Sequence, residues 1–136
     1  MEEMKKFIAH DLFARHLGIE VLECSQGKAL AKMEINSHHL NSAGILHGGA
    51  IFGLADAVFA VASNSHGTLA VAINAGISYF RAVRSGTIFA EAEEVSLNPK
   101  LATYVIRVKD EKGDPIALFE GTVYRKKERL GDLPGS

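Results

Sequence analysis

One stretch of the sequence combines an anion-binding backbone with an acid. His47-Gly48-Gly49 is followed by a single carboxylate, Asp56, eight residues after the first glycine. Glycine at the start of a helix lets a ligand approach the backbone closely. The first N–H groups of a helix have no internal partner and lie at the positive end of its dipole. The stretch therefore offers an anion-binding point at the start of a helix and, further along, a carboxylate.

The residues around this acid predict a buried helix. Residues 50–62 are apolar apart from Gly53 and Asp56, and proline is absent. A helix that is apolar on all faces is expected to be buried. Because an ionised Asp is rarely buried without a partner, we expect Asp56 to be functional. The structural alternatives are a carboxylate paired with a helix end or a serine and, for Gly48-Gly49, a plain tight turn or a close helix–strand crossing.

Length, charge and cysteine content restrict the class of protein. The 136 residues suit one domain (1–136), and the 47% hydrophobic content is typical of a globular chain. A net charge of −1 argues against nucleic acid as the main partner. The single cysteine, Cys24, favours a cytoplasmic location and is expected to be an inert packing residue. The sequence predicts neither a signal peptide nor a span of the bilayer, so we expect no membrane partner.

The remaining residues predict an α+β fold. Helical periodicity indicates an N-terminal helix over residues 4–17, and polar residues around Asn64 are expected to close the central helix. Helices on one face of a mostly antiparallel sheet give a layered fold in which the sheet must wrap the central helix. The tail, 127–136, is expected to fray. The expected strands cover residues 19–24, 28–35, 69–80 with a bulge at Gly76, 87–97, 101–109 and 116–125.

Several segments together carry a resemblance to a known family. They are Asn41-Ser-Ala-Gly-Ile-Leu-His-Gly-Gly49, Leu54-Ala-Asp56, Phe59-Ala60 and Ala62-Ser-Asn-Ser65. In these residues the chain resembles the PaaI-type acyl-CoA thioesterases, which have the hotdog fold. The order of expected elements matches that fold over almost the whole chain. The resemblance implies a sheet wrapped around the central helix, homodimers built edge to edge and, often, a dimer of dimers.

The resemblance also implies roles for individual residues. It makes Asp56 a base or nucleophile and the backbone N–H of Gly48 the oxyanion donor. Asn41 would hold water or the leaving group, and His47 would order the loop. Either side chain could instead serve only local hydrogen bonding, since Asn in a polar loop often supports its own turn. One departure is Ala72, which stands where some relatives carry a serine.

Cationic residues suggest where the phosphates of coenzyme A bind. Arg81 and Arg84 flank a turn after the strand that follows the central helix, and arginine suits phosphate. A solvated turn is the alternative. Lys100, beside another turn, is a weaker candidate, and Gly49 would let substrate approach the helix start.

A metal site is not expected in this chain. The adjacent pair His38-His39 has no cysteine or acid at ligand spacing around it. We also expect no cofactor beyond the coenzyme A that belongs to the substrate.

The leading hypothesis is an acyl-CoA thioesterase that favours small or aryl-acyl groups, such as phenylacetyl-type esters, over long fatty chains. A non-catalytic acyl-CoA-binding or sensing module is one alternative. A hotdog hydratase or dehydratase is another, although prolines expected near the glycine in that branch are absent. Release of thiol from a panel of acyl-CoAs would separate these classes.

The spacing of the two key groups predicts a site shared between subunits. Gly48 and Asp56 are separated by roughly 12 Å along a helix that rises about 1.5 Å per residue. A base must lie within about 3 Å of the water that it activates. One helix therefore cannot bring both groups to one thioester. We expect Asn41, His47 and Gly48 from one chain to act with Asp56 of its partner.

Overall fold

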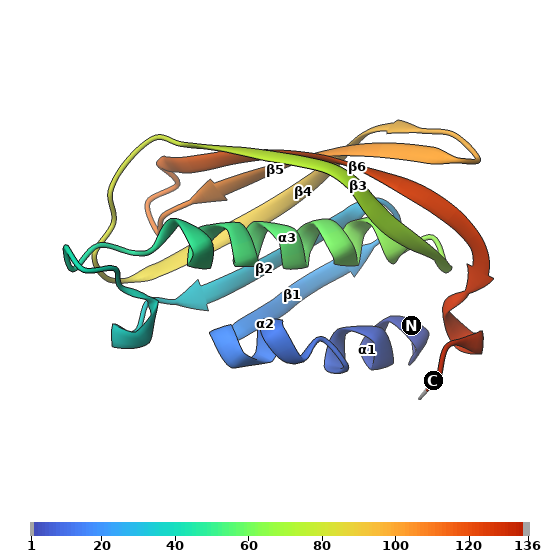
Figure 1. Ribbon diagram of the computed structural model, residues 1–136, viewed down its shortest axis with the longest axis horizontal. Helices are drawn as coiled ribbons and strands as arrows, with labels where there is room; N and C mark the ends of the chain where they lie inside the picture. The colour runs from blue at the N-terminus through green and yellow to red at the C-terminus, as the bar shows by residue number, and fades with distance from the viewer. Residues whose placement is uncertain (1, 135–136) are drawn as a thin grey trace.

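The computed structural model, which describes residues 2–134, is a six-stranded sheet curved around one long helix (Figure 1). All neighbouring strands pair antiparallel in the order β1-β2-β4-β5-β6-β3. The α+β hotdog architecture expected from the sequence is therefore confirmed. The strands are β1 (Ile19–Ser25), β2 (Lys28–Glu34), β3 (Thr68–Tyr79), β4 (Thr87–Leu97), β5 (Leu101–Lys109) and β6 (Pro115–Arg129).

The long helix, α3 (Gly48–Asn64), lies against the concave face of the sheet, and most of its residues are buried. The strands present alternate residues to it, as a half-buried strand should. Close packing depends on small residues: a Cβ at Gly121 of β6 would lie 2.7 Å from the Phe59 ring. Inward residues of β4 and β5 complete the core, namely Ile88, Ala90, Ala92, Tyr104, Ile106 and Val108.

One face of α3 is open in a single chain. Gly49 and Asp56 lie on it, with Asp56 exposed, and Phe52 and Ala60 are half-buried. These four positions recur every three or four residues and so lie on one side of the helix. The expectation that Asp56 is buried within its own chain is therefore wrong. An apolar composition predicts that a helix is covered, but it does not say that the cover comes from the same chain.

The N-terminal segment forms two helices instead of the single helix expected over 4–17. These are α1 (Glu2–Ala9) and α2 (Leu12–Leu17). The break has a capping cause: the Asp11 side chain accepts a hydrogen bond from the Ala14 N–H at 3.0 Å and so starts a new helix. Gly18 ends α2 in the left-handed conformation, which glycine adopts without strain. Gly53 leaves room for Leu17, so α2 packs closely on α3.

The C-terminal segment is ordered further than the sequence indicated. Strand β6 continues to Arg129, and a short helical turn, η2 (Leu130–Asp132), follows it. Leu130 is only 2% exposed, and its N–H donates to the Gly67 carbonyl at 3.0 Å. The expectation of a frayed tail is therefore wrong for residues 127–132, because one buried leucine anchors a charged segment. Residues 135–136 lie outside the described part of the chain.

Strand β3 is an edge of the sheet and pairs on one side only, with β6. Several large apolar side chains are exposed along it, with Ile73 at 59% and Phe80, just after its end, at 56%. Its pairing with β6 is irregular between Thr68 and Ala70 and between Ala72 and Asn74, so the bulge expected at Gly76 is misplaced. Among the described residues, no helix is long and apolar enough to cross a membrane.

Candidate active site

The start of α3 leaves one backbone donor unused. His47 caps the helix, and its Nδ1 accepts a hydrogen bond from the Gly49 N–H at 2.8 Å. The His47 carbonyl accepts from the N–H groups of Ala50 and Ile51. Within residues 2–134, nothing accepts from the Gly48 N–H. The histidine thus satisfies one helix donor and leaves its neighbour, the expected oxyanion donor, available to a ligand.

Asn41 lies in the exposed loop that leads to this helix start. Its Oδ1 accepts hydrogen bonds from the N–H groups of Ala43, at 2.9 Å, and Ile45, at 3.1 Å. Both bonds hold the turn, so the structural alternative considered for this residue is part of its role. They also fix the amide orientation, which leaves Nδ2 without an acceptor in the described chain. Asn41 can therefore only donate at the site.

Tyr79 is a site residue that the sequence did not reveal. It ends strand β3, and its hydroxyl donates to the Gly48 carbonyl at 2.9 Å. A Cβ placed on Gly48 would lie 3.1 Å from the Tyr79 ring and hydroxyl. A larger residue at position 48 would therefore require the exposed Tyr79 side chain to shift. No local pattern joins residues 31 positions apart, so only an open Tyr at the end of an edge strand could have hinted at this contact.

The Asp56 carboxylate faces the open side of α3 and has no hydrogen-bond or ion-pair partner among residues 2–134. The protein around it excludes enough water to raise the pKa of Asp56 above its ordinary value, and the nearby Asp11 carboxylate raises it further. An unpaired carboxylate with a raised pKa suits a base better than a structural anchor. The structural pairing considered for Asp56, with a helix end or a serine, is absent from the described chain.

The two arginines expected to bind phosphate differ in their partners. Arg81 is held by Asp110, with Nη2 and Oδ2 2.5 Å apart. Arg84 is exposed and unpaired in the described chain, and its segment runs beside the helix start because the Leu46 N–H donates to the Val83 carbonyl at 2.8 Å. Both arginines therefore lie at the Gly48 end of the molecule, where Asp110 competes for Arg81.

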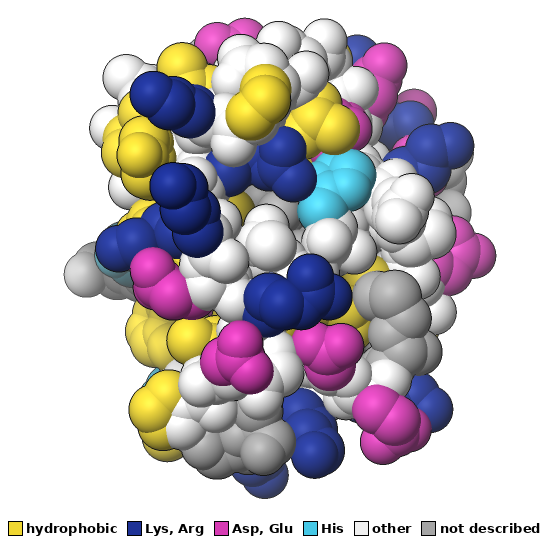
Figure 2. All heavy atoms as spheres, turned by 90° about the vertical axis from the view of Figure 1, so that its right-hand side faces the viewer, with side chains coloured by type: hydrophobic (Ala, Val, Ile, Leu, Met, Phe, Trp, Pro, Cys, Tyr) yellow, Lys and Arg dark blue, Asp and Glu magenta, His cyan; other side chains and the backbone are white. Residues whose placement is uncertain are grey.

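Lys100 lies at the other end of the molecule, in the turn between β4 and β5. Figure 2 faces that end and shows Lys and Arg side chains spread over it, with a histidine among them. Within one chain, Lys100 and the two arginines therefore lie at opposite ends of the molecule.

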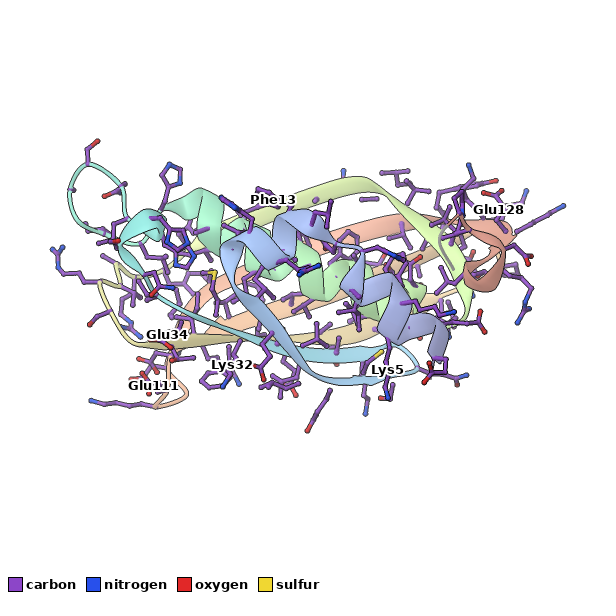
Figure 3. All side chains as sticks on the ribbon, turned by 90° about the horizontal axis from the view of Figure 1, so that it is seen from below. Lys5, Phe13, Lys32, Glu34, Glu111 and Glu128 are labelled. Atoms are coloured by element: carbon purple, nitrogen blue, oxygen red, sulfur yellow. The ribbon has the colours of Figure 1, made fainter. Side chains whose placement is uncertain are left out.

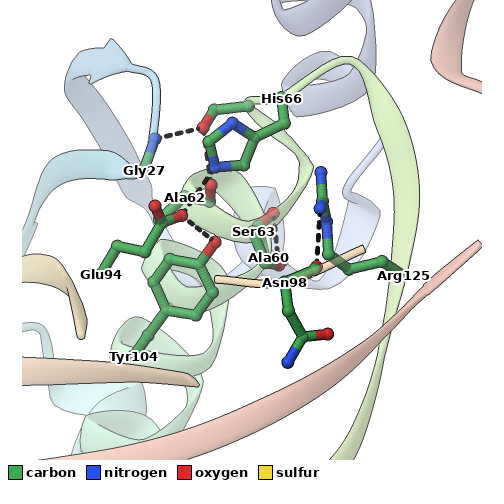
Figure 4. A network of polar contacts seen from close by, with 10 residues as sticks. Gly27, Ala60, Ala62, Ser63, His66, Glu94, Asn98, Tyr104 and Arg125 are labelled. Atoms are coloured by element: carbon green, nitrogen blue, oxygen red, sulfur yellow. Dashed lines mark hydrogen bonds and ion pairs between the residues drawn. The ribbon is translucent and has the colours of Figure 1, made fainter. Parts of the chain in front are cut away.

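The C-terminal end of α3 holds a separate polar network (Figure 4). Glu94 receives the Tyr104 hydroxyl at 2.5 Å and lies 2.6 Å from His66 Nε2. Burial alone would raise the pKa of Glu94, but these two hydrogen bonds outweigh it and hold the pKa below its ordinary value. Ser65 accepts from the Gly27 N–H at 2.8 Å and donates to the Ala62 carbonyl at 2.6 Å. Among the described residues, no buried side-chain polar atom lacks a hydrogen-bond partner, and the network fastens the end of the helix to the sheet.

The adjacent histidines His38 and His39 have different surroundings. His39 is buried, and its Nδ1 accepts from the Asn36 N–H while Nε2 donates to the Leu17 carbonyl at 2.8 Å. It therefore ties the loop to α2 as a structural residue.

Among the described residues, no group of three or more His, Cys, Asp or Glu side chains is placed to hold a metal ion. Cys24 is half-buried, and burial raises the pKa of its thiol.

The model of the thioesterase superfamily matches residues 43–117, more than half of the chain and all of α3. The chain belongs to this superfamily. Acyl-coenzyme A thioesterase PaaI of Escherichia coli is 33% identical to this thioesterase over 117 residues, covering 85% of this chain and 84% of PaaI. A candidate esterase of Archaeoglobus fulgidus is 45% identical over 130 residues, covering 94% of this chain and 84% of that protein.

Solved structures agree with the family. A variant of the phenylacetic acid degradation protein PaaI from Thermus thermophilus is 41% identical, with a TM-score of 0.82 over 85% of this chain and 100% of that one. The E. coli PaaI structure is 29% identical, with a TM-score of 0.90 over 94% of each chain. This thioesterase is thus a PaaI-type hotdog enzyme, a thioester hydrolase that acts on acyl-CoA.

Proposed function

We propose that this thioesterase hydrolyses small or aryl-acyl CoA thioesters, with Asp56 as base or nucleophile and the Gly48 N–H as oxyanion donor. The observation that carries the proposal is the unused N–H of Gly48, kept free because His47 occupies the donor beside it. A backbone donor at a helix start needs no reorganisation when negative charge develops on the thioester oxygen. Such a donor contributes roughly 3–4 kcal/mol of transition-state stabilisation.

The proposed reaction needs few groups. With Asp56 as base, its carboxylate takes a proton from water as the oxygen of that water bonds to the thioester carbon. The oxyanion is held by the Gly48 N–H, and collapse breaks the C–S bond and releases the thiolate of coenzyme A. With Asp56 as nucleophile, its oxygen bonds to the same carbon, and the C–S bond breaks with release of the thiolate of coenzyme A. Water then cleaves the resulting anhydride to give the free acid and restore the Asp56 carboxylate. General-base catalysis typically contributes about 10²–10⁴-fold.

The active unit in this proposal is a homodimer with two shared sites. Each site takes Asn41, His47 and Gly48 from one chain and the partner's Asp56. A two-fold axis that brings each helix start to the partner's Asp56 passes near Phe52, which lies midway between the two positions. The open face of α3 and the apolar edge strand β3 support this arrangement, because both need a cover that the described chain does not supply.

The same two-fold axis determines which cationic side chains meet at one coenzyme A site. Antiparallel helices bring the C-terminal end of one subunit beside the helix start of the other. Arg84, and Arg81 once it leaves Asp110, would then act with the partner's Lys100 on the phosphates of one coenzyme A. Gly49 allows the pantetheine arm to pass close to the backbone. Replacing Arg81 and Arg84 with Gln should raise KM for CoA thioesters more than for a pantetheine thioester.

The metabolic role, the location and the assembly are proposed by extension from the relatives. PaaI of E. coli is named from the phenylacetic acid degradation operon, and we extend a role in aryl-acid breakdown to this chain. We further propose a cytoplasmic location and a dimer of dimers. Sedimentation of the purified protein tests the assembly, and phenylacetyl-CoA as substrate tests the acyl class.

Asp56→Asn tests the proposed function. The side chain keeps its size, so the protein should fold and lose about 10²–10⁴-fold in kcat. Near-normal turnover by the folded variant would remove Asp56 from the mechanism. The matched control is Asp114→Asn, an exposed acid in the turn between β5 and β6, which should retain activity.

Mixed dimers test the shared site. Asn41→Ala and Asp56→Asn chains, carrying different tags, are co-expressed and purified through both tags. In a two-fold dimer, one site collects both changes and the other collects none. The mixed dimer should then recover roughly half of normal activity. Mixed dimers as inactive as either parent would show that each site is built within one chain.

A further inference from the structure

Two adjoining cavities lie between the N-terminal helices and α3. The first has a volume of about 120 Å³ and is enclosed by α1, α2, β1 and α3. The second, of about 320 Å³, lies between α1, α3 and the segment that follows β6. Phe7, Asp11 and Ala60 line both of them, so the cavities meet beneath the junction of α1 and α2.

The shared part of these cavities lies next to Asp56. Ala60 is one helical turn after Asp56 and on the same face of α3, while Ala57 is the next residue along. Asp11, which lines both cavities, is near enough for its charge to act on the Asp56 carboxyl. An acyl group whose carbonyl is held at Asp56 would therefore have the cavities directly ahead of it.

The first cavity suits a compact apolar group. Its space comes from small side chains on two sides, Ala9 and Ala14 on the N-terminal helices and Ala57 and Ala60 on α3. Apolar residues such as Ile8 and Val61 line most of the rest. A dry apolar cavity of about 150 Å³ is enough to bind benzene. At about 120 Å³ the first cavity is somewhat smaller than that, so it holds a short alkyl chain, whereas a ring or a longer chain must also occupy the space beside Ala60 that it shares with the second cavity.

We propose that these cavities bind the acyl group of the substrate and that α1 and α2 set the acyl preference of the enzyme. The inference rests on the proposed function of Asp56 and adds the place of the acyl group, whose apolar end would lie against Ala14 and Ala57. Each CH₂ group that is buried on binding should raise kcat/KM by about fourfold. Phe13 projects from α2 beside Gly53 of α3 and offers an apolar surface outside the two cavities (Figure 3).

Filling the cavity from the side away from Asp56 tests the inference. Ala14→Leu adds bulk from α2, and Ala9→Leu does so from α1. In either variant, the ratio of kcat/KM for phenylacetyl-CoA to that for acetyl-CoA should fall at least tenfold. The matched control is Lys6→Leu, which adds an apolar side chain to an exposed position of α1 outside both cavities and should leave the ratio unchanged. An unchanged ratio in folded Ala14→Leu or Ala9→Leu, or equal losses on both substrates, would overturn the inference.

A binding measurement separates this inference from the proposed function. Phenylacetate, the product acid, is titrated into the wild-type protein while backbone amide NMR signals are followed. Shifts centred on Ala14 and Ala57 that vanish in Ala14→Leu support the cavity site even if no CoA thioester is hydrolysed, in which case only the proposed function fails. Hydrolysis of phenylacetyl-CoA without such shifts would leave the proposed function intact and overturn the cavity site.

Discussion

The two ends of α3 differ in how they use their polar groups. At the start, the Gly48 N–H and Asn41 Nδ2 have no acceptor in the described chain, and the surface is open. At the end, Asn64 and Ser65 are almost fully buried and hydrogen-bonded to the strands and turns around them. Figure 4 shows the neighbouring contacts of Glu94 with His66 and Tyr104 at this end.

This difference indicates a division of tasks along one helix. A buried polar group without a partner costs about 1–3 kcal/mol. The buried C-terminal end of α3, around Asn64 and Ser65 and called the closed end below, must therefore make all its hydrogen bonds to be stable. An exposed donor can remain unused because water satisfies it until a ligand replaces the water. The closed end therefore holds the helix in register on the sheet, and the open end can then present donors at fixed positions.

Among the variants that test this difference between the two ends of α3, the largest effect is expected from one at the closed end. Glu94→Ala leaves the Tyr104 hydroxyl, on a residue with no exposed surface, without its acceptor. The free energy of unfolding should fall by about 1–3 kcal/mol, while kcat of the folded enzyme stays unchanged. Denaturant unfolding measures this, with Tyr104→Phe as the partner in a double-mutant cycle.

The same variant predicts a pH dependence. The pKa of Glu94 is lower in the folded protein, so its contribution is present above the ordinary carboxyl pKa and is lost as pH falls through the folded pKa. The stability gap between wild type and Glu94→Ala should therefore narrow in acid. A gap that stays constant down to acidic pH, or a loss of kcat with normal stability, would contradict the assignment of Glu94 to the closed end.

The next effect is expected from Gly48→Ala at the open end. The new Cβ would lie 3.1 Å from the Tyr79 ring, so either the ring or the helix start must move. Activity should fall about tenfold or more, because a small displacement of an oxyanion donor is costly. The matched control is Gly76→Ala, where a Cβ meets nothing within 4 Å. If both variants keep wild-type kcat, the close approach at Gly48 has no role.

Removing the Tyr79 hydroxyl should have a smaller effect. Tyr79→Phe loses the hydrogen bond to the Gly48 carbonyl, for which a net contribution of about 0.5–1.5 kcal/mol is typical. We expect kcat to fall about 2- to 12-fold with KM nearly constant, since a positioning group acts on the transition state. Tyr124→Phe, another exposed tyrosine, serves as the control. A rise in KM alone would make Tyr79 a substrate contact instead.

The smallest effect is expected from Asp11, whose carboxylate acts on Asp56 in the middle of α3. Asp11→Asn keeps an oxygen that can cap α2 but removes the charge that helps to raise the pKa of Asp56. The pKa of Asp56 should fall, and the acidic limb of the pH profile of kcat/KM should move to lower pH. The control is Asp132→Asn in η2. A limb that does not move would show that Asp11 does not act on the base.

Much of the fold could be predicted because periodicity is local. The apolar run of α3 and the alternation in β4 and β5 appear in the sequence within a few residues. The N-terminal break was missed because Asp11, a capping residue, looks in the sequence like one polar position in a longer helix. The ordered tail was missed because Leu130 is buried by Gly67 and the N-terminal helices, which are remote in sequence.

For the site, the sequence identified residue types better than their surroundings. The motif placed Gly48 and Asp56 on one helix, as the structure has them. It could not show that Arg81 binds Asp110, 29 residues away, or that Tyr79 packs on Gly48. It also predicted a buried Asp56, because composition cannot say which face of a helix its own chain leaves open.

The contact between the first and last segments of the chain has a consequence for synthesis on the ribosome. One wall of the larger cavity comes from residues 3–11 and the opposite wall from residues 130–134. The helices α1 and α2 emerge before the strands, yet residues 130–134, which pack against α1, emerge only after all six strands. A nascent chain can form its early hairpin and α3 while α1 still lacks Leu130, and its apolar side remains open to chaperones. Emergence of residues 130–134, more than growth of the sheet, then marks the moment when α1 can pack.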